Sequence, residues 1–133
     1  MRTSLLLAAS LLLAACAATK NTPLAEIPQL TKLDDVMDNQ ATTADPQFKK
    51  IGQASFDDAE LAALAQAAER LQATSLKTKE FAKGRAEFEA LATRLNEKAK
   101  ALGAAAGAKD PKAISASLTE MKAACKGCHS KFR

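Results

Sequence analysis

The chain has 133 residues, of which 47% are hydrophobic and 4% aromatic, with no tryptophan or tyrosine. Its net charge of +4 comes from 19 basic and 15 acidic residues that are interspersed along the sequence, so neither a basic patch nor stacking aromatics suggest binding to nucleic acid. This length supports one domain with one core. Because alanine and leucine dominate and glycine and proline are few, the composition predicts an all-α fold.

The first fifteen residues have the layout of an export signal. Arg2 supplies a positive charge, and the run from Leu5 to Leu13 is almost wholly apolar, which is typical of a secretory signal. The run is too short to cross a bilayer as a helix. We therefore predict that residues 1–15 are a signal peptide and that the protein is exported to the periplasm.

The signal ends in Leu13-Ala14-Ala15-Cys16, which resembles the bacterial lipobox, where cleavage occurs before a cysteine that carries lipid. The resemblance implies that Cys16 is lipidated, that residues 16–27 form a tether, and that several acyl chains hold the protein on the membrane. Ala17 and Ala18 replace the aspartate that retains many such proteins at the inner membrane, so the outer membrane is expected. Ordinary cleavage slightly later is the alternative, and it would leave a soluble periplasmic protein.

The folded domain is predicted to span residues 28–133, with Pro28 opening its first helix. Apolar residues recur at spacings of three and four along one face of this helix, and the pattern ends after Gln40. These residues are Leu30, Leu33, Val36 and Met37. Asp45-Pro46 then predicts a separate short helical piece that ends near Gly52.

Three further helices follow. The second is predicted over residues 55–74, with Asp57 and Glu60 as a capping box, and the third from residue 78 into the 103–108 stretch. Asp110-Pro111 opens the fourth as a cap and a first-turn proline. Four amphipathic helices with short connections predict an antiparallel four-helix bundle.

The last nine residues carry the strongest motif, Cys125-Lys126-Gly127-Cys128-His129 followed by Ser130 to Arg133. This is the attachment pattern of a c-type haem. On a helix both thiols and the imidazole present to one side, so the thiols can add to two vinyl groups of one porphyrin while His129 binds the iron. The cysteines continue the apolar stripe of Ile114, Leu118 and Met121, which predicts that the haem lies inside the bundle.

Two other uses of these cysteines fit less well. A structural zinc site needs four ligands, and the only further sulfur or imidazole is that of Cys16, more than a hundred residues away. A thioredoxin-like pair needs a helix N-terminus in a βαβ setting, whereas no strand pattern is present. A haem-free structural lipoprotein remains as an alternative.

A haem motif in the last turns of the fourth helix, ending in an aromatic residue and an arginine, resembles the class II c-type cytochromes. These include cytochrome c′ and its low-spin relatives, and the similarity covers residues 28–133. It implies one covalent haem c, with Cys125 and Cys128 in thioether bonds, His129 as the proximal iron ligand and Arg133 beside the proximal face. Phe132 stands where the family usually has a tyrosine. Many members are homodimers through the first two helices, although no residue here specifies one.

The family differs in what fills the sixth position of the iron. In the low-spin relatives a methionine of the first helix binds there, and the resemblance assigns this role to Met37. Met1 would be removed with the signal peptide. Met121 lies on the helix that supplies His129 and therefore borders the same face of the haem. If Met37 is instead a gap-filling core methionine, Leu33 and Val36 would be the apolar residues over an open position.

We therefore expect a carrier of single electrons that works with redox protein partners. It is not expected to be an enzyme, because the sequence offers no constellation of acid, base and nucleophile. The alternative is a five-coordinate cytochrome c′ that binds nitric oxide or another small gas. Contact with a membrane is expected through the lipid anchor only.

Overall fold

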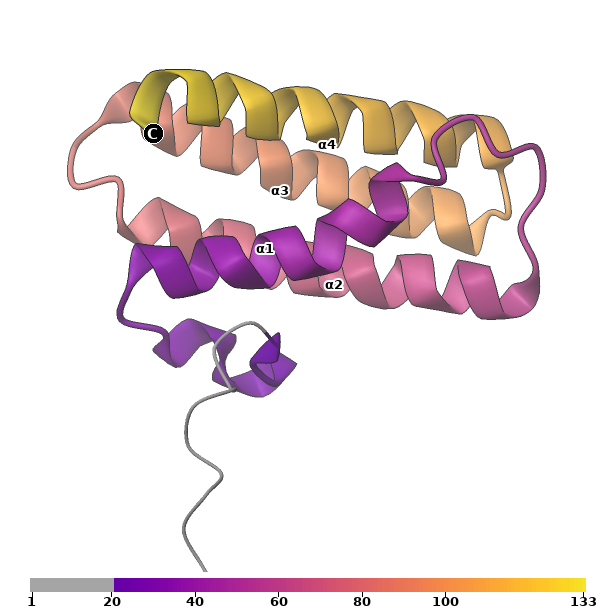
Figure 1. Cartoon of the computed structure of the whole chain (residues 1–133), viewed down its shortest axis with the longest axis horizontal. Coiled ribbons are helices and arrows are strands. Elements are labelled where there is room, and N and C mark those ends of the chain that lie inside the picture. The colour runs from indigo at the N-terminus through magenta and orange to yellow at the C-terminus, as the bar shows by residue number, and fades with distance from the viewer. Residues whose placement is uncertain (1–20) are drawn as a thin grey trace, which may run out of the picture.

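The computed structural model describes residues 21–133, which form a bundle of helices with no strand in this part of the chain. A short 3-10 helix, η2 (Leu24–Gln29), precedes four α-helices. These are α1 (Leu33–Phe48), α2 (Asp58–Glu80), α3 (Ala86–Gly107) and α4 (Pro111–Phe132). Figure 1 shows the four lying side by side, with η2 outside α1 and α2. The predicted all-α class is confirmed.

None of the helices within residues 21–133 has the length and apolar character needed to cross a membrane. The predicted signal peptide and Cys16 lie outside the described residues.

The core joins α2, α3 and α4 along their inner faces, and α1 contributes Ala44 to it. Phe48, Ile51 and Phe56 pack against this core from the end of α1 and the loop that follows. Within that loop the Gly52 N–H donates to Ser115 Oγ of α4 at 3.0 Å. The C-terminal half of α1 is therefore fixed to the core, and the cavity described below lies along the same helix.

Two of the helix starts predicted from capping side chains, those of α2 and α4, are confirmed, whereas the start predicted at Asp45-Pro46 is wrong because this pair lies inside α1. At α2 the Glu60 N–H donates to Asp57 Oδ1 at 2.8 Å and the Asp57 N–H donates to Glu60 Oε2 at 3.0 Å, which is a complete capping box. At α4 Asp110 Oδ1 accepts from the N–H groups of Lys112 and Ala113, while Pro111 takes the first helical position.

The first helix differs from the prediction at both ends. Pro28 lies inside η2, and α1 begins at Leu33. Because Thr22 and Ile27 are already buried, the packed structure begins before the predicted domain boundary at residue 28. At the other end α1 continues through Pro46, since Ala44 and Phe48 on either side of the proline both pack on the core.

The boundary between the second and third helices also differs. Helix α2 continues to Glu80, so Thr78 lies within it rather than at the start of the next helix. Thr74, Ser75 and Thr78 extend the buried face of α2, but they are polar and therefore invisible to a search for apolar periodicity. Gly84, with φ of +82°, helps to make the turn into α3.

A buried polar network ties the segment before η2 to the bundle. Asn39 Oδ1 accepts from the Thr22 N–H at 3.0 Å and from Arg70 Nη2 at 3.1 Å. Asn39 Nδ2 donates to Thr22 Oγ1, and Arg70 Nη2 also donates to the Thr22 carbonyl oxygen at 2.8 Å. One fully buried side chain of α1 therefore connects the N-terminal segment with α2.

We predict that Asn39→Ala lowers the free energy of unfolding by about 1–3 kcal/mol, because it leaves buried partners without their hydrogen bonds. It should also speed proteolysis of residues 21–30. Denaturant unfolding and limited proteolysis measure both effects. Thr42→Ala, at an exposed position of the same helix, is the control and should change neither. Unaltered unfolding of the Asn39 variant would contradict the assigned role.

Candidate functional site

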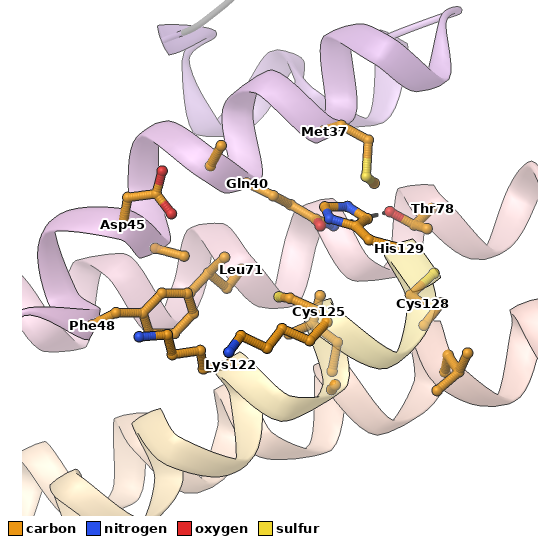
Figure 2. A pocket seen from close by; sticks show the side chains of 17 residues that line it. Met37, Gln40, Asp45, Phe48, Leu71, Thr78, Lys122, Cys125, Cys128 and His129 are labelled. Carbon is orange, nitrogen blue, oxygen red and sulfur yellow. Dashed lines mark hydrogen bonds between the residues drawn. The ribbon is translucent and has the colours of Figure 1, made fainter. Parts of the chain in front are cut away.

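A cavity of about 250 Å³ opens between α1 and α4, with walls from all four helices. Figure 2 shows its lining side chains. A second cavity of about 360 Å³ adjoins it toward the end of α4 and shares Met37, Ala41, Cys128 and His129 with it. The two spaces together have the size of a cofactor pocket.

The wall formed by α4 carries the predicted attachment residues. Cys125, Cys128 and His129 all line the first cavity, and their spacing of three and four residues places them on one helical face. In Figure 2 the two sulfur atoms lie on either side of the imidazole ring. Cys125 packs against the core, whereas His129 is exposed. The structure therefore brings these three residues together.

The wall formed by α1 carries Met37, which lines both cavities. Its side chain extends from α1 toward His129 in Figure 2. Leu33, one turn earlier, lines the second cavity. Val36 is fully buried and belongs to the lining of neither cavity. Of the three predicted α1 residues, the structure therefore places Met37 and Leu33 at the site and Val36 away from it.

The remaining lining fits a flat apolar group. Short side chains face the first cavity from three helices, namely Ala41, Ala44, Ala92 and Ala124. The leucines of the lining come from α2 and α3. They are Leu71, Leu91 and Leu95. Longer side chains at the alanine positions would occupy the space. A haem fits this arrangement, because its apolar macrocycle matches the lining, and its iron would supply redox or ligand-binding chemistry.

The protein environment disfavours the thiolate forms of Cys125 and Cys128. Burial raises the pKa of Cys125 to about 11, and the neighbouring Cys128 and Asp45 add to this effect. Burial also raises the pKa of Cys128, against the opposing charge of Arg85. Since the thiolate is the nucleophile that reacts with oxidants and disulfides, the raised pKa values lower the reactivity of both thiols.

The last turn of α4 packs against the start of α3. Phe132 meets Phe88 edge to face with the ring centroids 5.3 Å apart. The guanidinium of Arg85 lies over both rings, 4.4 Å from the centroid of Phe88 and 5.6 Å from that of Phe132. Phe132 thus has a packing role that needs no hydroxyl group. Arg133 is exposed and lines the second cavity.

Two buried polar residues of the cavity were not singled out from the sequence. Gln40 Nε2 donates to Thr78 Oγ1 at 2.9 Å, and Thr78 Oγ1 donates to the Thr74 carbonyl oxygen at 2.8 Å. The spacing of three residues from Met37 could have identified Gln40. Thr78 could not have been found, because the sequence placed it at the start of a different helix.

The family model described as cytochrome c′ matches residues 62–133. The chain belongs to the cytochrome c′ family. The matched region includes most of α2, all of α3 and α4 and the haem motif, whereas α1 and Met37 precede it. This confirms the resemblance to class II c-type cytochromes, and membership implies a covalent haem. No curated protein and no solved structure matches the chain.

Proposed function

We propose that this cytochrome carries one covalent haem near the C-terminal end of α4, in an antiparallel four-helix bundle, and transfers single electrons without enzymatic turnover. Cys125 and Cys128 form the thioether bonds, and His129 and Met37 bind the iron. The observation that supports this best is the position of Met37 on the cavity wall opposite His129.

The chemistry of its surroundings supports ligation by Met37. A thioether is the only sulfur ligand that α1 offers within the described residues, and it lies on the same cavity face as Ala41 and Ala44. A histidine and methionine pair raises the reduction potential of a haem. Such a haem suits exchange of electrons with redox protein partners, because its iron does not need to gain or lose a ligand.

The alternative is a five-coordinate haem that binds nitric oxide or another small gas. The alanines beside Met37 favour it, since they leave space on the α1 wall. Rapid mixing of the ferrous protein with nitric oxide separates the two functions. We expect binding to be limited by displacement of Met37 and to become much faster in Met37→Ala. Equally fast binding by both proteins would favour the gas-binding function.

We further propose that the protein is exported to the periplasm and anchored to the outer membrane by lipid on Cys16. Because the packed structure begins at Thr22, the tether is residues 16–21, which reach at most about 20 Å when extended. The anchor would therefore hold the cytochrome close to the membrane surface.

Cys16→Ser is expected to move the protein from the membrane fraction to the soluble periplasmic fraction, because lipid can no longer be attached. Fractionation with intact-mass spectrometry measures both the location and the lipid. A parent protein that is itself soluble and begins after Cys16 would show ordinary signal cleavage instead.

A further inference from the structure

We propose that Gln40, oriented by Thr78, donates a hydrogen bond to a small anionic or strongly polarised ligand bound to the haem on the side of α1. Cyanide and carbon monoxide are suitable probes of such a ligand. The inference rests on the proposed function only in that the haem occupies the cavity between α1 and α4. A ligand can occupy this side of the haem only where Met37 does not bind the iron or has been displaced from it.

Gln40 lies on the cavity face of α1, one helical turn after Met37. His129 belongs to the opposite wall on α4. An imidazole that binds the iron from α4 leaves the α1 wall facing the other side of the haem. In Figure 2 the side chain of Gln40 extends from α1 toward Thr78, in the region that also holds Met37 and His129.

Thr78 fixes which way the amide points. A threonine hydroxyl has one hydrogen, and that of Thr78 is given to the Thr74 carbonyl oxygen at 2.8 Å. The oxygen of Thr78 can therefore only accept, so the nitrogen of Gln40 must face it, at 2.9 Å. The nitrogen of a glutamine amide has a second hydrogen. The bond to Thr78 does not use that hydrogen, so it can be donated to a ligand in the cavity that Gln40 lines.

Gln40 and Thr78 differ from the charged residues of the cavity lining in being buried. Gln40 is 8% exposed and Thr78 is 4% exposed, whereas the charged lining residues Asp45, Lys122 and Lys126 are exposed. A buried amide is costly in an apolar wall unless it is hydrogen-bonded, and a leucine would fill the same wall without that requirement. A donor at this place discriminates among ligands, because it favours those that carry negative charge on their outer atom.

The purely structural explanation is that the pair braces α1 against α2. It predicts a change in stability when Gln40 is replaced, but no change in a bound ligand. The stretching frequency of carbon monoxide separates the two roles, because a donor near its oxygen increases back-donation from the iron and lowers the frequency. Ligand affinity gives a second, independent readout.

The experiment compares Met37→Ala with Met37→Ala/Gln40→Leu, so that methionine does not compete for the sixth position. In the ferric holoprotein, cyanide affinity should fall on the order of 10-fold, as expected for a hydrogen bond to a charged group. In the ferrous holoprotein the carbon monoxide stretch should move to higher frequency. Thr78→Val in the same background should shift both in the same direction by less. Gln47→Leu, the same substitution on α1 outside both cavities, should change neither.

Unchanged cyanide affinity and carbon monoxide frequency in a folded Gln40→Leu protein would overturn the proposal. Failure of Met37 ligation is recognised separately, as a parent protein whose ferric spectrum is already high-spin, and the Gln40 comparison then decides the matter without the Met37 substitution. A parent protein without covalent haem would overturn both proposals.

Discussion

Replacing both Cys125 and Cys128 by serine is expected to abolish covalent haem attachment completely. The two thiols lie on the cavity face of α4, and the serine hydroxyl cannot form the thioether bonds. Haem retained by His129 and Met37 alone should dissociate in denaturant, whereas the haem of the parent protein should stay with the polypeptide. Intact-mass spectrometry and haem staining of denaturing gels measure the difference.

Either single substitution should leave one thioether bond and detectable covalent haem. Cys16→Ser is the matched control, because it removes the third cysteine of the chain and should leave haem attachment unchanged. Full covalent loading of the double variant would contradict the assignment of these thiols. A parent protein without haem, made in a host able to mature c-type cytochromes, would instead support a haem-free structural lipoprotein.

Met37→Leu is expected to convert a low-spin ferric haem to a high-spin one and to lower its reduction potential. Leucine conserves volume well, so the change removes the sulfur ligand and leaves the α1 wall filled. The potential should fall by a sizeable part of the roughly 0.8 V range over which axial ligands set haem potentials. Visible spectra and a redox titration of the holoprotein measure both effects.

Met121→Leu is the control for this substitution. Met121 is fully buried in the core on α4 and lines neither cavity, so its replacement should preserve both the spin state and the potential. The account would be contradicted if Met37→Leu retained the parent's low-spin spectrum and potential.

The sequence predicted the all-α class and the two capped helix starts because these depend on local features. Asp57 with Glu60, and Asp110 with Pro111, identify their helix ends without any tertiary contact. The start of α1, its passage through Pro46 and the length of α2 were predicted wrongly. Each of these is decided by packing: Ile27 within η2 is buried, Ala44 and Phe48 reach the core, and Thr78 is a polar residue at a buried position.

In the candidate site, too, some features could be predicted from the sequence and others depend on tertiary packing. The spacing of Cys125, Cys128 and His129 was enough to predict that they share one wall, and Met37 was assigned to the opposite wall through the family resemblance. That Val36 faces away from the cavities depends on the rotation of α1, which apolar spacing alone does not determine. Gln40 and Thr78 are 38 residues apart in sequence and lie on different helices. Only the tertiary structure brings such a buried pair together.

The most direct test of His129 and Met37 as the two iron ligands is electron paramagnetic resonance of the ferric parent holoprotein. This measurement reports whether the sixth position of the iron is filled by a strong ligand. We predict a low-spin signal from a single haem. A predominantly high-spin signal would contradict Met37 ligation and would identify the protein as a five-coordinate, gas-binding cytochrome.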